Sequence, residues 1–132
     1  PGTKINQLTQ NIDFAPTFLD LCGIEIPADM QGISFKPLLE GKKVKNWRKY
    51  LYYHYYEFPG FHSVRAHYGI KGKRYKLHFY KDNNWELYDL KTDPHEMNNI
   101  FGKPGTEKIT CKLKAELKKL QQTYQVPEEL CR

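Results

Sequence analysis

Cysteine is scarce in this sequence, and its spacing argues against two common uses of the residue. The three cysteines are Cys22, Cys111 and Cys131, an odd number with no Cys-x-x-Cys pair among them. This spacing argues against a zinc site and against a full disulfide framework. Pairing of Cys111 with Cys131 would require the C-terminal tail to fold back, and it stays open at this point.

Long apolar runs are also missing. No stretch approaches the roughly 20 apolar residues that cross a bilayer, and no signal-peptide pattern is present. We therefore expect no membrane span. The sequence starts at Pro1-Gly2 without an initiator methionine, so we expect it to be a piece of a longer protein.

What the sequence does contain is aromatic and basic. Its 132 residues, 39% hydrophobic and 14% aromatic, suit one modest folded domain rather than a disordered chain. Ten tyrosines and seven phenylalanines favour strands that bury large rings. The net charge of +6 and pI near 9.2 suit an anionic partner, which could be nucleic acid, a membrane surface, or a sulfated or phosphorylated glycan.

The first third of the chain predicts a helix followed by a long loop. Apolar residues over 12–22 predict a helix with Asp13 as a plausible cap and Gly23 as its end. They surround so much of the helix that we expect burial on more than one side. Prolines and glycines punctuate residues 23–41, which predicts a loop with a short helical turn at 35–40. The basic run over 42–49 is expected to be solvated.

Four short runs, joined by short turns, predict an antiparallel meander. The first run is almost continuously aromatic, as in a strand buried on both faces or at an aromatic sheet edge. In the third, Tyr75, Leu77 and Phe79 alternate and should face the core. The four predicted strands span residues 50–56, 63–70, 74–80 and 85–90.

A turn and a helix complete the predicted architecture. After the fourth strand, Asp93 is well placed as an N-cap with Pro94 at the first position of a short helical turn. Residues 107–124 predict a helix whose apolar stripe can cover one sheet face. The predicted fold class is α+β, a four-stranded antiparallel sheet with a C-terminal helix packed on it. The stripe consists of Ile109, Leu113, Leu117, Leu120 and Tyr124.

Three separated segments resemble the same family in the same order. Residues 10–24 with 30–41 resemble the helix and loop that close the large domain of sulfatases, with Cys22 where the family usually has alanine. Residues 62–70 with 73–77 resemble the arginine-tyrosine-lysine strands of bacterial glycan sulfatases. Residues 85–100, with Glu-Leu-Tyr-Asp-Leu-x-x-Asp-Pro-x-Glu, closely resemble the run near the C-terminus of type I sulfatases.

The resemblance implies two parts and a missing catalytic centre. Residues 1–48 would be the tail of the large, alkaline-phosphatase-like sulfatase domain, and residues 49–132 the C-terminal subdomain. Such sulfatases hydrolyse sulfate esters with a formylglycine made in a Cys/Ser-x-Pro-x-Arg motif, beside a calcium ion held by Asp and Asn. The sequence has neither this motif nor an Asp-Asp pair. We therefore expect no catalytic residue and no cofactor here, with calcium and formylglycine in the missing N-terminal domain.

The implied role is that of a C-terminal fragment, inactive alone, of an enzyme that acts on a sulfated glycan. It would buttress the catalytic domain and help shape the substrate pocket, in a parent protein that is periplasmic or secreted. Two other classes stay open. One is a small basic module that binds nucleic acid or another polyanion through exposed aromatic rings. The other is a purely structural lid.

The polar side chains give no metal site. None of the five histidines pairs with another at i, i+4 spacing or lies near a cysteine pair. The acidic residues Asp89, Asp93 and Glu96 lie at a strand end and a predicted cap, positions that favour structural roles.

The candidate substrate-contact residues are His67, Arg65 and His62. On a strand over 63–70, Arg65 and His67 would share one face, and Val64 and Ala66 would take the core side. An arginine offers a planar fork of donors, and a histidine can donate or accept, so together they suit an anion or sugar hydroxyls. The alternative is that Arg65 pairs with a carboxylate and the histidines satisfy backbone carbonyls.

Overall fold

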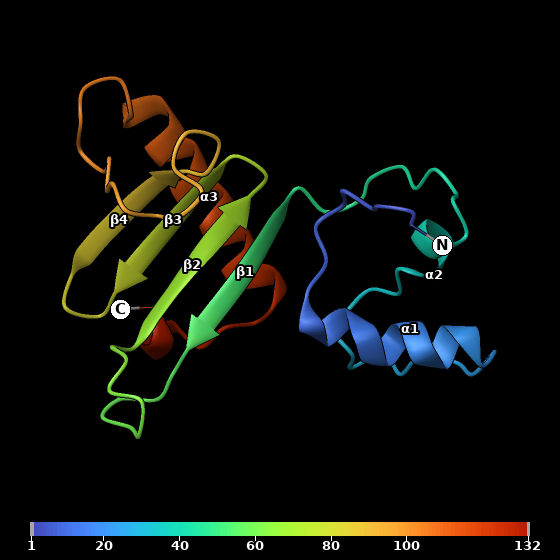
Figure 1. Cartoon of the computed structure of the whole chain (residues 1–132). Helices are drawn as coiled ribbons and strands as arrows, with labels where there is room; N and C mark the ends of the chain where they lie inside the picture. The colour runs from blue at the N-terminus through green and yellow to red at the C-terminus, as the bar shows by residue number, and fades with distance from the viewer. Residues whose placement is uncertain (1, 132) are drawn as a thin grey trace. The chain divides into compact units, whose positions relative to one another are not determined.

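Four strands, each six residues long, form one antiparallel sheet in the order β1-β2-β3-β4. Aliphatic side chains meet across two of the three strand pairings, with Ile70 opposite Leu77 and Leu77 opposite Leu87. The predicted meander is confirmed (Figure 1). The computed structural model describes residues 2–131. Its strands are β1 (Tyr50–Tyr55), β2 (His67–Gly72), β3 (Tyr75–Tyr80) and β4 (Asn84–Asp89).

One long helix, α3 (Glu107–Thr123), covers one face of this sheet and lies behind it in Figure 1. The apolar stripe predicted from the sequence is the buried side of α3, where Leu113 and Leu117 are almost fully enclosed. Burying such side chains stabilises the unit by about 25 cal/mol per Å² of apolar surface. The buried core consists of Tyr68, Ile70, Leu77, Phe79, Leu87, Leu113 and Leu117.

The second strand is shorter than predicted. It begins at His67 rather than at residue 63, because Ser63 has a positive φ of 51°, which interrupts an extended backbone. The Ser63 N–H donates to the Gly60 carbonyl at 3.0 Å and closes a turn. Arg65 therefore lies in the segment leading into the strand, and its prediction as a strand residue is wrong.

The predicted helical turn after Pro94 is also absent. The Asp93 carboxylate does act as a cap, since it accepts from the N–H groups of Met97 at 3.1 Å and Asn98 at 2.8 Å. Glu96, however, has a φ of 57°, which is incompatible with a right-handed helix. Asp93 thus closes a single non-helical turn.

Residues 2–49 form a compact unit of their own, separate from the unit that begins at Tyr50. It contains α1 (Phe14–Leu21), preceded by the 3-10 turn η1 (Asn11–Asp13), and the short α2 (Lys36–Leu39). The last element of the chain is η2 (Glu128–Leu130).

Two predictions about this N-terminal unit are wrong. Asp13 does not cap α1 through its side chain, and Arg48 is not solvated, since its side chain is only 8% exposed. The two side chains form a buried ion pair instead, because Asp13 faces the loop rather than the free N–H groups of the helix.

The cysteines are all free, so Cys111 and Cys131 do not pair. Within residues 2–131 no helix has the length and apolar content needed to cross a bilayer.

Candidate substrate-contact site

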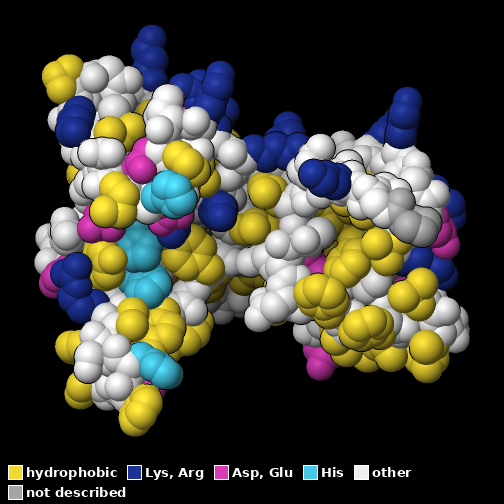
Figure 2. Space-filling view, in the orientation of Figure 1, with side chains coloured by type: hydrophobic (Ala, Val, Ile, Leu, Met, Phe, Trp, Pro, Cys, Tyr) yellow, Lys and Arg dark blue, Asp and Glu magenta, His cyan; other side chains and the backbone are white. Residues whose placement is uncertain are grey.

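The face of the sheet opposite α3 carries a row of aromatic and polar side chains. Successive strands place Tyr53, Gly69, His78 and Glu86 side by side, because Tyr53 pairs with Gly69, Gly69 with His78, and His78 with Glu86. The next row holds Tyr55, His67 and Tyr80. Figure 2 shows histidine side chains gathered on this face among hydrophobic side chains, a class that includes tyrosine there. We call these residues the open face.

Gly69 makes the first row possible. The Tyr53 hydroxyl reaches across it to Nδ1 of His78, with 2.9 Å between the two atoms. A Cβ at Gly69 would lie 2.3 Å from the Tyr53 hydroxyl oxygen and 2.5 Å from the Leu77 carbonyl oxygen. A side chain there would therefore push Tyr53 away from His78.

His78 is the most enclosed polar group of this face, with 6% of its surface exposed. Burial, together with the smaller effects of the neighbouring His67, Lys76 and Arg65, lowers its pKa to about 4. Its Nε2 has no hydrogen-bond partner within residues 2–131. The ring is therefore neutral at neutral pH.

His67 is held by stacking and by one hydrogen bond. Its ring lies between Tyr55, at 5.4 Å and 14° between planes, and His78, at 4.4 Å and 30°. Its Nδ1 lies 2.7 Å from the Arg65 carbonyl oxygen. A carbonyl only accepts, so Nδ1 carries the proton and Nε2 of the neutral ring is left as an acceptor.

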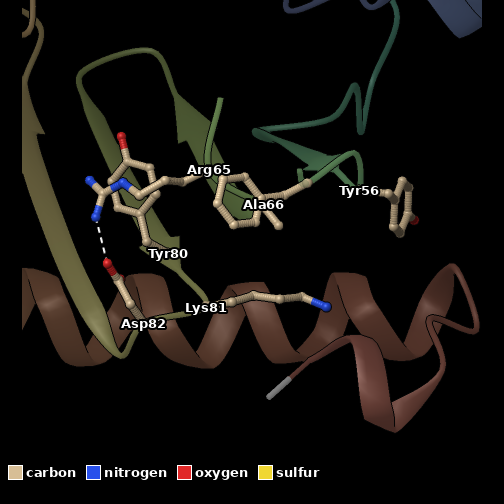
Figure 3. A pocket seen from close by; sticks show the side chains of 7 residues that line it. Tyr56, Arg65, Ala66, Tyr80, Lys81 and Asp82 are labelled. Atoms are coloured by element: carbon tan, nitrogen blue, oxygen red, sulfur yellow. Dashed lines mark hydrogen bonds and ion pairs between the residues drawn. The ribbon is translucent and has the colours of Figure 1, made fainter. Parts of the chain in front are cut away.

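Arg65 is fixed over an aromatic ring next to His67. Its guanidinium carbon lies 3.9 Å from the centre of the Tyr80 ring, and Nη1 donates to the Asp82 carboxylate at 2.5 Å, as Figure 3 shows. The hydrogen bond to Asp82 raises the pKa of Arg65 above its ordinary value. His67 also packs edge-on against Tyr80, so Arg65 and His67 converge on one tyrosine.

The structure thus brings together two of the three predicted residues. Arg65 and His67 share Tyr80, although they do not share a strand. His62 stands apart: its ring packs on Phe61, which is 95% exposed. Within residues 2–131 no hydrogen bond or ring contact joins His62 to Arg65 or His67. The alternative interpretation predicted that Arg65 pairs with a carboxylate and that a histidine bonds to a backbone carbonyl. Both contacts are present, from Arg65 to Asp82 and between His67 and the Arg65 carbonyl.

Sequence reasoning missed three members of the open face, Tyr53, His78 and Tyr80. The sequence did contain a pattern from which His78 and Tyr80 could have been predicted. The alternation that assigns Tyr75, Leu77 and Phe79 to the core assigns His78 and Tyr80 to the opposite face. Pairing of that strand with the one before it then places them beside His67.

With the neighbouring Arg65, which lies over Tyr80, this face offers a guanidinium, an imidazole acceptor and aromatic surfaces. Such groups suit the binding of sugar hydroxyls and anions. Among the described residues no group of three or more His, Cys, Asp and Glu side chains comes together to hold a metal, and no Cys/Ser-x-Pro-x-Arg motif occurs in the sequence. These residues therefore do not fit a calcium–formylglycine centre, and we derive no catalytic step from them.

The fold is that of the C-terminal region of sulfatases. The family model described as N-sulphoglucosamine sulphohydrolase, C-terminal, matches residues 1–123, and the chain belongs to that family. The prediction of a sulfatase C-terminal subdomain is confirmed.

The names of two curated relatives describe enzymes that act on sulfated sugars. An N-acetylglucosamine-6-O-sulfatase of Bacteroides thetaiotaomicron is 52% identical over 127 residues, covering 93% of this chain and 23% of the relative. A Δ4,5-hexuronate-2-O-sulfatase of the same organism is 39% identical, covering 83% of this chain and 23% of the relative. This chain therefore spans about a quarter of the length of these relatives.

Solved structures confirm the fold. A protein solved in complex with its substrate D-glucosamine-2-N,6-O-disulfate is 50% identical and superposes with a TM-score of 0.81, covering 86% of this chain and 24% of that one. A 2-O glycosaminoglycan sulfatase is 33% identical with a TM-score of 0.77, over 86% of this chain and 25% of that one. A phosphonate monoester hydrolase of Agrobacterium radiobacter, 21% identical with a TM-score of 0.76, shares the fold.

Proposed function

We propose that this chain is the C-terminal part of an enzyme that hydrolyses sulfate esters of a sulfated, glucosamine-containing glycan. It buttresses the catalytic domain and helps shape the substrate pocket, and it has no activity alone. The observation that carries the proposal is the pair of Arg65 and His67 fixed against Tyr80. The sugar class is suggested by the names of the relatives that are 52% and 50% identical.

Within this function, His67, Arg65 and His62 contact the substrate. Nε2 of His67 accepts a hydrogen bond from a sugar hydroxyl, since its Nδ1 is already bonded to a backbone carbonyl. Arg65 uses the guanidinium donors that Asp82 leaves free to bind a sulfate or a hydroxyl. His62 lies in the exposed loop before Arg65 and closes on a bound sugar from there.

The test is kinetic and uses the intact protein that contains this chain. His67→Ala, Arg65→Ala and His62→Ala are compared on a sulfated glucosamine oligosaccharide and on a small aryl sulfate. The loss of a charged hydrogen bond of about 1.5–3 kcal/mol predicts a fall in kcat/KM of about 10- to 100-fold for Arg65→Ala on the oligosaccharide. The fall on the aryl sulfate should be smaller.

Lys73→Ala is the matched control, because Lys73 is an exposed residue of the turn between β2 and β3, at the other end of the sheet from Tyr80. It should match the wild type on both substrates. If all three alanine variants turn over the oligosaccharide like the wild type, His67, Arg65 and His62 do not contact the substrate.

The parent protein should carry calcium and formylglycine in the domain that this chain lacks, and we propose that it is periplasmic or secreted. The rival proposal, a small basic module for nucleic acid, predicts tighter binding of single-stranded DNA than of a sulfated oligosaccharide. Titration of both ligands at several salt concentrations separates the two proposals.

A further inference from the structure

A cavity of about 380 Å³ opens between the segment that leaves β1 and the turn that joins β3 to β4. Its size suits a sugar unit, since small-molecule sites are of a few hundred Å³. Figure 3 shows the side chains that line it. The lining residues are Tyr56, Phe58, Arg65, Ala66, Tyr80, Lys81 and Asp82. We call this the Tyr56–Lys81 cavity.

The backbone holds the two sides of this cavity together. The Lys81 N–H donates to the Ala66 carbonyl at 3.3 Å, one step beyond the pairing of His67 with Tyr80. The ion pair of Arg65 with Asp82 crosses the same gap. Side chains from both segments are therefore kept at a fixed separation.

The charges of the cavity do not balance. It has two cations, Arg65 and Lys81, against one carboxylate, Asp82. The charge of Arg65 is balanced by Asp82, with 2.5 Å between Nη1 and the carboxylate oxygen. Lys81 forms no ion pair with any residue from 2 to 131, and in Figure 3 its side chain extends along the cavity toward Tyr56. Its ammonium is the charge left over for a ligand.

The remaining walls are aromatic and exposed. Tyr56 stacks on His54 with ring centres 3.9 Å apart and 18° between planes. This stacking fixes the orientation of the Tyr56 ring. It is nevertheless 59% exposed, and Phe58 is 58% exposed. Aromatic surfaces that stay in water beside an unpaired ammonium suit a ligand with one apolar face and one negative group.

We propose that the Tyr56–Lys81 cavity binds an acidic sugar unit of the glycan, a pyranose that carries a sulfate or a carboxylate. Lys81 pairs with the acidic group, and Tyr56 and Phe58 pack on the C–H face of the ring. The choice of a sugar rests on the proposed function. The inference that the ligand carries a negative group rests on the cavity itself, because the Lys81 ammonium there has no ion-pair partner among the described residues.

Binding measurements on the intact protein test this inference without using its activity. Three tetrasaccharides serve as probes at low and high salt: a sulfated heparin tetrasaccharide, the same chain desulfated but still carboxylated, and neutral tetra-N-acetylchitotetraose. Calorimetry gives the dissociation constants. At least one acidic probe should bind, and the neutral one should bind at least tenfold more weakly.

Lys81→Met should weaken the acidic probes about tenfold, the loss expected for one charge-assisted contact of about 1.4 kcal/mol. Lys81→Arg should restore most of the binding because it keeps the charge. Phe58→Ala should weaken the binding of all three probes. Lys73→Met removes an exposed lysine from the opposite end of the sheet and should change nothing. Comparison of the two acidic probes tells whether sulfate or carboxylate is the preferred group.

The inference fails if Lys81→Met binds the acidic probes as tightly as the wild type, whether or not the protein hydrolyses sulfate esters. The proposed function fails separately if the intact protein releases no sulfate while binding stays sensitive to Lys81. Equal binding of neutral and acidic probes also overturns the inference, since the unpaired ammonium would then have no ligand.

Discussion

The carboxylate of Asp13 is bound on both oxygens by the guanidinium of Arg48, 35 residues further along the chain. Nη2 of Arg48 lies 2.7 Å from Oδ1 and Nη1 lies 2.9 Å from Oδ2. Asp13 is fully buried, and it also accepts from the N–H groups of Gln10 and Ile33. One carboxylate thus ties the start of α1 to two later segments of the N-terminal unit.

Removal of one partner of this pair should unfold the N-terminal unit before the sheet. Arg48→Ala leaves a buried carboxylate without its cation, which costs about 3–5 kcal/mol. We expect faster hydrogen exchange in residues 10–35 with little change in residues 67–89, measured by mass spectrometry. Lys45→Ala is the matched control, because Lys45 is exposed and has no ion pair among the described residues. Equal protection in Arg48→Ala and the wild type would contradict the role assigned to the pair.

The isolated chain should associate through α1, or residues 1–45 should lose their order. Phe14, Phe18 and Leu21 are each more than half exposed, and Figure 2 shows hydrophobic side chains gathered over α1. Burial of such a patch gains roughly 25 cal/mol per Å². Phe18→Ser should lower the association constant in sedimentation experiments. A monodisperse wild-type monomer with this segment ordered in solution would refute the prediction.

The chain alone should release no sulfate from an aryl sulfate. It has no Cys/Ser-x-Pro-x-Arg motif, and the role that we propose for its open face is substrate recognition, not catalysis. The measurement is sulfate released above buffer, with the intact protein as the positive control. Turnover by the pure chain at the rate of the intact protein would mean that the nucleophile lies within these residues.

Stability should fall as the pH drops from about 6.5 to about 4. The pKa of His78 is lowered from 6.5 to about 4 in the folded state. Between pH 6.5 and pH 4, therefore, this histidine is protonated in the unfolded chain but stays neutral in the folded chain. The stabilisation is complete above the ordinary histidine pKa of 6.5 and is lost progressively toward 4. The loss is at most about 3 kcal/mol, and the lowered pKa of His54 adds to it.

Urea unfolding at several pH values tests this. His78→Gln should flatten the pH dependence, whereas His95→Gln should leave it unchanged, since His95 is exposed. An unchanged slope in His78→Gln would show that the buried imidazole does not control the pH dependence.

The sequence by itself determined the sheet-and-helix unit. Alternation in residues 75–80 and the apolar stripe of residues 109–124 are local periodicities, and a period of two or of about 3.6 decides which side chains face a core. The family was also recognisable, because its motifs are short continuous runs. The edge position of β1 agrees with its aromatic run, since every residue of that strand is only half-buried.

Only the tertiary structure decided the site and the contacts of the N-terminal unit. The Asp13–Arg48 pair joins residues 35 positions apart, and nothing local distinguishes Arg48 from the solvated lysines around it. The start of β2 at His67 depends on a turn closed by Ser63, which removed Arg65 from the strand face where alternation had placed it. Tyr53, His67 and His78 lie on three strands, and they meet because Gly69 leaves space across the sheet. Cross-strand contacts depend on register, which turn geometry and packing fix together and a single run of sequence does not carry.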